Sequence, residues 1–258
     1  MDIVRNLGSK TLKCLSGMGL MSIFLGKAFL YSVTPPLKIK RVMKQISFMG
    51  TQSLFVILLT GIFAGMVMGL QGFRILSRVG SEAFLGPMVA LPLIKELGPV
   101  FTGLMVTGRA GSAITAEIGI MRISNQIDAI ELMGLNPFNY LIVPNLIAGI
   151  ISLPLLTAVF SVIGVLGGYL VGVNLLGLEG GIYFGEMASY IQLQDIAEGL
   201  YKSLSFGIII SWVCCYKGYY SGRWGQGAEG VSRATTRAVV FSSVFILIWD
   251  YFMTSIFF

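Results

Sequence analysis

Two long stretches without a charged residue constrain this chain more than any other feature. Residues 45–73 include 29 consecutive uncharged positions, and residues 132–178 include 47. A membrane-spanning helix needs about 20 predominantly apolar residues. Only 12% of the 258 residues are charged, about half the share of soluble domains. The sequence therefore predicts an all-α integral membrane protein and excludes a soluble enzyme.

The hydrophobic pattern predicts five transmembrane helices, at about 45–73, 84–108, 142–173, 199–216 and 238–257. A helical hairpin that turns near Pro154 is an alternative to the long third span. Glycines recur at four-residue spacing in two of these spans, at positions 61, 65 and 69 and at positions 164, 168 and 172. Such small residues predict that another helix packs closely against each span.

The charge distribution predicts how the chain is oriented. Residues 1–47 contain eight basic residues and one acidic residue, which favours a cytoplasmic N-terminus. Residues 1–44 form the predicted N-terminal region, with an interfacial amphipathic helix at 3–18. Residues 20–31 are expected to dip into the membrane, with a short first span as the alternative. The transmembrane domain is 45–258. The loop at 174–198 has acidic but no basic residues, so it is expected outside, as is the C-terminus.

Residues 115–135 are predicted to form one amphipathic helix that is too polar to span the membrane. Charged side chains alternate there with isoleucines at helical spacing, and the charged positions are Glu117, Arg122, Asp128 and Glu131. The segment falls in a cytoplasmic loop of the predicted topology. A rigid polar helix in that place is suited to docking on a cytoplasmic partner, although many loop helices have no such role.

Charges near mid-membrane and at the predicted outer end of a span mark a candidate binding site. Lys95 and Glu96 lie inside the second span, close to Pro92 and Pro99. Charges within a span face protein or water, and prolines there free backbone carbonyls, so a cavity wall is expected. Arg74 and Arg78 follow the first span on its predicted outer side. Basic residues there are suited to holding an anionic headgroup.

Missing residue types and motifs narrow the function. The chain has no histidine and only three cysteines, which argues against histidine-dependent hydrolysis and against a metal site. It has no complete phosphate-binding loop, so any ATP must be used by another chain. Nucleic acid is an unsuitable partner, because the basic residues are interleaved with apolar ones. Three classes remain: a permease subunit driven by a separate ATPase, a secondary transporter and, less well supported, a membrane-embedded enzyme.

Four motifs resemble the MlaE permease family. They are Glu-Leu-Gly-Pro-Val at 96–100, Gly-Arg-Ala-Gly-Ser-Ala-Ile-Thr-Ala-Glu-Ile-Gly at 108–119, Ile-Ser-Leu-Pro-Leu-Leu at 151–156 and Ser-Arg-Ala-Thr-Thr-Arg at 232–237. The similarity extends from about residue 45 to the C-terminus. The long second motif is specific. The first 45 residues match the family in character only.

The resemblance implies a subunit of an ABC transporter that moves phospholipid between the inner and outer membranes of a Gram-negative cell and maintains outer-membrane lipid asymmetry. It implies a homodimer in the inner membrane. The implied partners are a cytoplasmic ABC ATPase, a STAS-domain protein and a periplasmic MCE-domain protein. The permease would need no cofactor, because the partner ATPase would use ATP and magnesium. A secondary transporter of a lipid or another amphiphile remains the alternative.

The resemblance also implies which residues contact lipid. The family contacts carried over are Leu70, Leu76, Lys95, Glu96 and Leu97. Acyl chains are expected against Met68, Leu70, Leu76 and Leu97, and the phosphate near Arg74, Arg78 and Lys95. Glu96 is expected to balance Lys95 and to contact an ethanolamine headgroup. Lys95 stands where the family is expected to have arginine, so the charge is kept but bidentate phosphate geometry is not.

Overall fold

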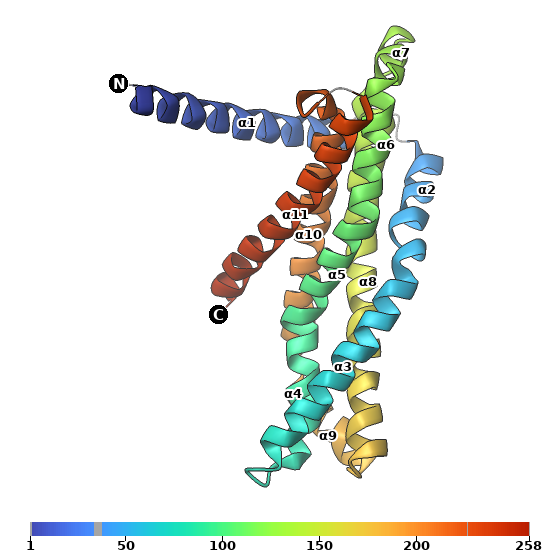
Figure 1. The fold of residues 1–258 in the computed structure, drawn as a ribbon. Helices are drawn as coiled ribbons and strands as arrows, with labels where there is room; N and C mark the ends of the chain where they lie inside the picture. Colours follow the sequence, from blue (N-terminus) through green and yellow to red (C-terminus); the bar gives the residue numbers. More distant parts are fainter. Residues whose placement is uncertain (1, 34–37, 226, 258) are drawn as a thin grey trace.

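The computed structural model describes residues 2–33, 38–225 and 227–257, and within these ranges the chain is helical, without strands. Six helical segments in this part of the chain are long and apolar enough to cross a membrane. Five of them pack lengthwise into an elongated bundle, and the sixth, α1 (Asp2–Val33), runs across one end of it (Figure 1). This arrangement confirms the predicted all-α membrane fold.

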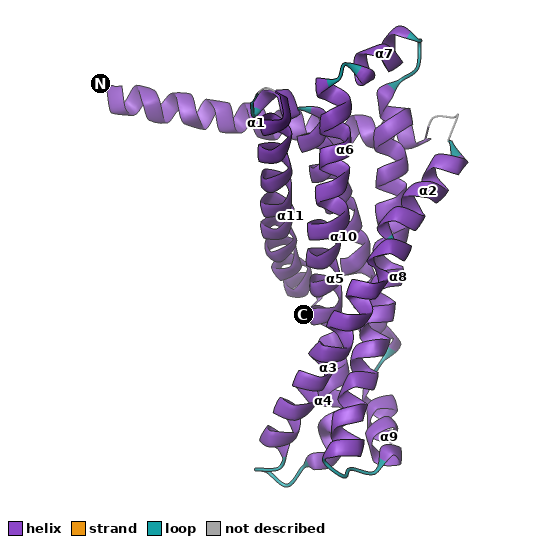
Figure 2. Cartoon of the chain, turned by 45° about the vertical axis from the view of Figure 1, so that its right-hand side comes forward, coloured by secondary structure: helices purple, strands orange, loops and turns teal. Residues whose placement is uncertain are grey.

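The helix α1 is continuous and runs nearly at right angles to the bundle in both views (Figures 1 and 2). The predicted amphipathic helix at 3–18 and the predicted dip at 20–31 are therefore parts of one helix. Its second half packs on the bundle through the buried Phe24 and Ala28, and Trp212 Nε1 donates a hydrogen bond to the Met21 carbonyl (2.9 Å).

The first predicted span is longer than expected. It consists of α2 (Ile39–Met49), the 3₁₀ turn η1 (Thr51–Ser53) and α3 (Leu54–Leu76). The third is the π-helical turn η5 (Phe138–Ile142), α8 (Val143–Tyr169) and the π-helical turn η6 (Leu170–Leu175). Because α8 passes through Pro154 without a turn, the alternative hairpin is wrong. A proline removes one N–H donor, and packed neighbours make that tolerable within a membrane helix.

The glycines that recur at four-residue spacing in the first and third predicted spans face each other where α3 crosses α8. We call these two rows the glycine ladders. Gly61, Gly65 and Gly69 are buried on α3. A Cβ atom added to Gly65 would lie only 1.7 Å from the Gly164 carbonyl oxygen, and one added to Gly69 would lie 3.2 Å from Gly168. The two backbones can approach this closely only because both positions lack side chains. The prediction of close helix packing is confirmed.

The second predicted span does not end near residue 108. The turn η2 (Glu82–Phe84) leads into one continuous helical path through α4 (Leu85–Pro92), the π-helical turn η3 (Leu93–Leu97), α5 (Gly98–Val106), the π-helical turn η4 (Thr107–Gly111) and α6 (Ser112–Ile123). The short helix α7 (Gln126–Leu132) follows and forms the tip of the bundle (Figure 1). We call this tip the α7 end.

The prediction of one helix over 115–135 is therefore wrong. The chain breaks at Ser124 and Asn125, where Asn125 adopts a left-handed conformation (φ 56°). Asparagine tolerates that conformation better than most residues. The break splits the predicted isoleucine stripe. Ile127 and Ile130 are the buried residues of α7, whereas Ile120 and Ile123 remain exposed on α6.

The opposite end of the bundle, the α9 end, is closed by α9 (Gly180–Tyr190), which lies within the predicted external loop. Tyr183 anchors α9 by donating a hydrogen bond to the Val165 carbonyl on α8 (3.2 Å). Burial raises the pKa of Tyr183 to about 12, so the phenol keeps its proton at neutral pH and remains a donor.

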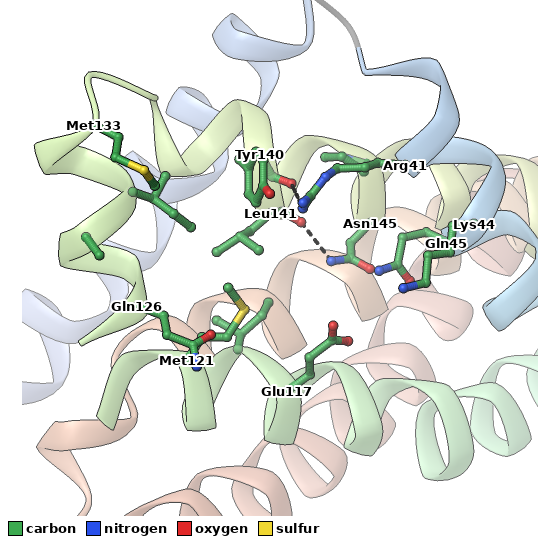
Figure 3. Close-up of a pocket in the computed structure, with 14 residues that line it drawn as sticks. Arg41, Lys44, Gln45, Glu117, Met121, Gln126, Met133, Tyr140, Leu141 and Asn145 are labelled. Carbon is green, nitrogen blue, oxygen red and sulfur yellow. Dashed lines mark hydrogen bonds between the residues drawn. The ribbon is translucent and has the colours of Figure 1, made fainter. Parts of the chain in front are cut away.

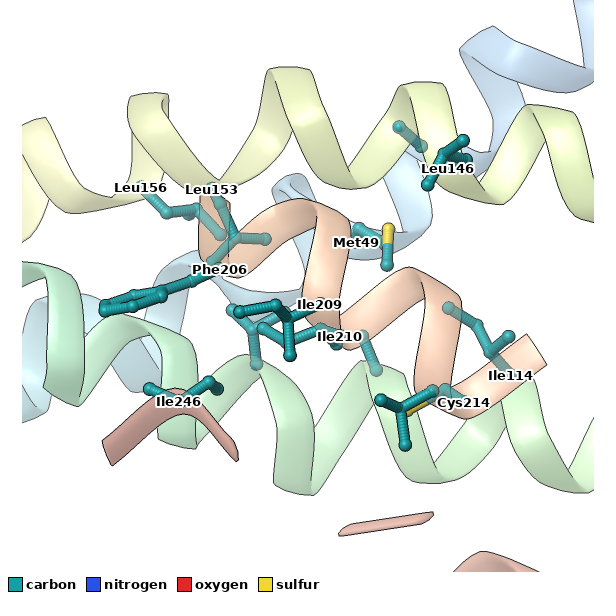
Figure 4. Close-up of a cluster of buried hydrophobic side chains, with 14 of the residues drawn as sticks. Met49, Ile114, Leu146, Leu153, Leu156, Phe206, Ile209, Ile210, Cys214 and Ile246 are labelled. Carbon is teal, nitrogen blue, oxygen red and sulfur yellow. The ribbon is translucent and has the colours of Figure 1, made fainter. Parts of the chain in front are cut away.

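The last two spans complete the bundle. The helix α10 (Leu193–Tyr219) leads through the turn η7 (Ser221–Arg223) to α11 (Gly227–Phe257). The core lies where α10 meets α6, α8 and α11, and it holds Phe206, Ile210 and Cys214 (Figure 4). Arg233 and Arg237, predicted in a loop, lie in the first turns of α11. The helix α11 ends part-way along the bundle, while α3 and α4 continue to the α9 end (Figure 1).

Candidate functional site

A widened helical turn carries the two charges that mark the predicted site. Pro92 ends α4 and Pro99 is the second residue of α5, and between them η3 forms π-helical hydrogen bonds. Prolines remove N–H donors on both sides, and π turns often occur at functional sites. The Ser161 hydroxyl on α8 donates to the Leu93 carbonyl (3.2 Å). Gly199 of α10 approaches so closely that an added Cβ would lie 2.2 Å from the Ile94 carbonyl oxygen.

Lys95 and Glu96 form ion pairs with different helices. The Lys95 ammonium lies 3.0 Å from Asp195 and 2.9 Å from Glu198, both on α10. The Glu96 carboxylate lies 2.5 Å from the Lys202 ammonium, also on α10. Lys202 further donates to the hydroxyl of Thr254 on α11 (2.7 Å). The turn η3 is thereby tied to both of the last two spans.

The prediction that Glu96 neutralises the charge of Lys95 is wrong, because the two side chains do not form an ion pair with each other. Consecutive residues on a helix point in different directions. Lys95 therefore reaches the first turns of α10, and Glu96 reaches Lys202 one to two turns farther along. Each charge is neutralised, but by a partner about 100 positions away in the sequence.

Burial divides this network into an outer and an inner layer. The side chains of Lys95 and Glu96 are 34% and 35% exposed, whereas that of Lys202 is 1% exposed and that of Glu198 is 8% exposed. Asp250 of α11 lies 3.5 Å from Lys202. The network of two lysines and four carboxylates carries a formal charge of −2. We call these residues the η3 cluster: Lys95, Glu96, Asp195, Glu198, Lys202 and Asp250.

Sequence reasoning missed the inner layer of the η3 cluster. Asp195 and Glu198 were expected in an external loop, but they belong to α10. A signal was present, because Asp195, Glu198 and Lys202 are spaced three and four residues apart and so share one helix face. Lys202 also lies inside a predicted span, where a charge normally needs a partner. Nothing in the sequence identified Glu96 as that partner.

Among the described residues, the predicted lipid-contact residues on and just beyond α3 form no ion pair or hydrogen bond with the η3 cluster. Met68 and Leu76 are half-buried on α3, and Leu70 is exposed. Arg74 in the last turn of α3 and Arg78 just beyond it are exposed at the α9 end. Gly72 of α3 packs against Leu85, and residue 85 is ten positions from Lys95, or about 15 Å along a helix. Leu97 is half-buried within η3 itself.

The predicted coupling residues lie around the break between α6 and α7. Arg122 of α6 forms an ion pair with Asp128 of α7 (2.7 Å). Glu131 accepts a hydrogen bond from the Tyr219 hydroxyl (3.4 Å). Glu117 lies farther down α6, where it lines a cavity rather than the tip. Thus three of the four predicted residues gather at the break between α6 and α7, whereas Glu117 lines the cavity beside it.

The α7 end exposes large apolar side chains. Leu132 is 90% exposed and Met133 is 67% exposed. Together with Ile120 and Ile123 they leave an apolar surface beside charged groups, which is typical of protein contact sites.

Within the described residues, no group of three or more metal-ligating side chains could hold a metal ion.

Comparisons with known proteins agree with the family resemblance. The family model described as Permease MlaE matches residues 42–256. The intermembrane phospholipid transport system permease protein MlaE of Haemophilus influenzae is 40% identical over 258 residues, covering 100% of this chain and 94% of that protein. A probable ABC transporter permease protein of Rickettsia bellii is 43% identical, covering 100% of this chain and 98% of its own.

A more distant relative is the Arabidopsis thaliana chloroplast protein TRIGALACTOSYLDIACYLGLYCEROL 1. It is 35% identical over 240 residues, covering 92% of this chain and 67% of that protein. The family model covers most of the chain, and the bacterial relatives match over nearly their full lengths. The chain therefore belongs to the MlaE permease family.

Proposed function

We propose that this chain is the permease subunit of an ABC transporter that moves phospholipids between the inner and outer membranes and so maintains outer-membrane lipid asymmetry. Family membership supports the class of transporter. The observation that carries the role of this particular chain is the layered η3 cluster. Its two outer charges are accessible from outside the protomer, while buried charges on α10 and α11 hold them in position.

The layered arrangement is suited to a zwitterionic headgroup. A phosphate can bind the exposed side of the Lys95 ammonium, which keeps its ion pairs with Asp195 and Glu198, and an ethanolamine ammonium can approach Glu96. Because Lys95 and Glu96 already have protein partners, the site without lipid carries no unpaired charge. Lipid binding then adds to the existing ion pairs without breaking them, so the buried carboxylates keep their cations. Leu97 is placed to contact the adjoining acyl chain.

Coupling to ATP hydrolysis is proposed to occur at the α7 end. Arg122, Asp128 and Glu131 surround an exposed apolar tip, which fits a groove on a cytoplasmic ABC ATPase that binds ATP and magnesium. The helical path from α6 to η3 is unbroken. Movement of the tip can therefore reach the η3 cluster along a single helix.

The remaining assembly follows the family expectation. We propose a homodimer in the Gram-negative inner membrane, with a STAS-domain protein on the ATPase and an MCE-domain protein on the periplasmic side. The N-terminus is cytoplasmic and the C-terminus periplasmic in this proposal. The basic region before the first span supports that orientation. The helix α11 presents exposed apolar residues, including Val240, Val244 and Leu247, that can contact lipid or another chain.

The test is transfer of a fluorescent phospholipid by the purified complex in proteoliposomes. ATP should drive transfer, and Glu96→Gln should reduce it at least tenfold while the complex still assembles. A secondary transporter is the second candidate, because four carboxylates around two lysines could also carry protons. Transfer that needs a proton gradient but neither ATP nor the ATPase would support that candidate and refute the ABC proposal.

A further inference from the structure

A second polar site lies at the α7 end, far along the bundle from the η3 cluster. It is a cavity of about 470 Å³ bounded by α2, α6, α7 and the start of the third span. This volume falls within the range of small-molecule pockets. Figure 3 shows Arg41 and Gln45 of α2 on one side of the cavity, with Glu117 and Met121 of α6 opposite.

The cavity separates positive and negative charge. Arg41 and Lys44 supply cations from α2, and Glu117 supplies a carboxylate from α6. The Arg41 guanidinium stacks 3.2 Å from the centre of the Tyr140 ring and donates to the Tyr140 carbonyl (3.2 Å), so its position is fixed. In the described part of the chain, the ion pairs include none of these three charged groups.

Two buried side-chain oxygen atoms in the cavity wall have no hydrogen-bond donor among the described residues. Asn145 is 4% exposed, and its amide nitrogen donates to the Leu141 carbonyl (2.7 Å). Its side-chain oxygen and that of Gln45 are buried and unpartnered among the described residues. Buried polar atoms are nearly always satisfied in folded proteins. With Glu117 they form a set of acceptors that calls for a ligand rich in N–H donors.

These features together suit a ligand with two opposite charges. A primary ammonium fits the acceptors of Gln45, Asn145 and Glu117, and a phosphate fits the cations of Arg41 and Lys44. A quaternary ammonium could not donate to the two amide oxygens. A simple anion would leave those oxygens unpartnered. The chemistry that fits all five side chains is a phosphoethanolamine group.

The surroundings favour a lipid as the source of that group. The helix α2 exposes Ile39 (71%) and Met43 (61%) beside Lys40 and Lys44, a mixture typical of helices at the membrane surface. Lys44 and Glu117 are both exposed, so the polar part of the cavity is open to the outside. We propose that this cavity binds the headgroup of a phosphatidylethanolamine molecule of the cytoplasmic leaflet. The proposal deepens the proposed function, because it adds a second headgroup site.

The experiment uses the permease purified with its partner chains in nanodiscs. A photo-reactive benzoyl-phenylalanine replaces Gln126, which is exposed at the cavity rim, or Ile39, which is exposed on α2 outside the cavity. The nanodiscs contain phosphatidylcholine alone, or phosphatidylcholine with an equal share of phosphatidylethanolamine or phosphatidylglycerol. Mass spectrometry after irradiation counts the lipid adducts.

Phosphatidylethanolamine should label position 126 at least fivefold more than either other lipid does, whereas position 39 should show no such preference. Glu117→Gln and Lys44→Gln should each reduce this adduct at least threefold. The matched control Lys40→Gln changes an exposed lysine of α2 outside the cavity, so it should leave the adduct unchanged. Because all three side chains are exposed, the variants should elute from size-exclusion chromatography as the parent complex does.

Other outcomes overturn the proposal. No excess labelling at position 126, or equal labelling by all three lipids, would exclude a headgroup site. Preferential labelling by phosphatidylglycerol would show a site for anions only. Binding of free phosphoethanolamine in detergent without any lipid adduct would assign the cavity to a soluble ligand. A lipid adduct at position 97 in the same preparation tests the η3 cluster separately, so failure of one site is distinguishable from failure of the other.

Discussion

The η3 cluster and the α7-end cavity solve the problem of polar groups in a membrane protein in opposite ways. In the η3 cluster every charged side chain has an opposite charge within 3.5 Å, and the deepest cation is almost fully buried. In the cavity, Arg41, Lys44 and Glu117 have no ion pair among the described residues. We therefore expect the loss of a charge to destabilise the η3 cluster more than the loss of Lys44 or Glu117 destabilises the cavity.

The largest loss of stability is expected from Lys202→Met. The substitution removes the buried cation and leaves Glu96 and Asp250 facing each other without it. Breaking a buried ion pair from one side costs about 3–5 kcal/mol. Thermal unfolding of the purified protein should show this loss, while Lys40→Met on exposed α2 should not. Equal midpoints for the two variants would mean that the η3 cluster does not stabilise the fold.

A smaller loss of stability is expected from Gly199→Ala. The new Cβ would lie 2.2 Å from the Ile94 carbonyl oxygen, so α10 must move away from η3. An overpacked contact of this kind lowers the free energy of unfolding by about 1–3 kcal/mol. Gly185→Ala on α9 is the matched control, because its added Cβ meets nothing within 4 Å. Thermal unfolding midpoints of the two variants check this prediction. A midpoint for Gly199→Ala equal to or above that of the control would show that η3 and α10 can separate freely.

The sequence predicted the spans and the glycine ladder because both depend on local composition and spacing. Gly65 and Gly164 could be identified as packing positions from their four-residue repeats alone. The ion pairs of the η3 cluster could not, since Lys95 and Asp195 meet only after two long helices have packed side by side. The break at Asn125 was missed because the isoleucine spacing continues through it, and the choice of turn depends on how α7 buries Ile127 and Ile130.

At the α7 end, Arg122→Gln should change stability little and function strongly. Arg122 and Asp128 are partly exposed, and such pairs contribute about 0–1 kcal/mol. The pair nevertheless fixes the angle between α6 and the proposed docking helix α7. ATPase activity of the complex stimulated by phospholipid should fall, and the charge exchange Arg122→Asp with Asp128→Arg should restore part of it. Full activity in the Arg122→Gln variant would show that the ion pair plays no part in coupling.

The smallest effect on stability is expected from Glu117→Gln. Glu117 is exposed and unpaired among the described residues, and surface substitutions usually stay within about 0.5 kcal/mol. Its thermal midpoint should match that of the parent protein. A destabilisation comparable to that of Lys202→Met would erase the contrast between the two regions.

We propose that Lys95 and Glu96 present a phospholipid site whose state depends on the ATPase at the other end of the same helical path. The most direct measurement is photo-crosslinking of phospholipid from position 97 in nanodiscs, with and without ATP trapped on the partner. Position 155, which is 62% exposed on α8, reports contact with bulk lipid. The position 97 adduct should be abundant without ATP and fall severalfold when ATP is trapped, while the position 155 adduct stays constant. No adduct at position 97, or one unaffected by ATP, would contradict the account.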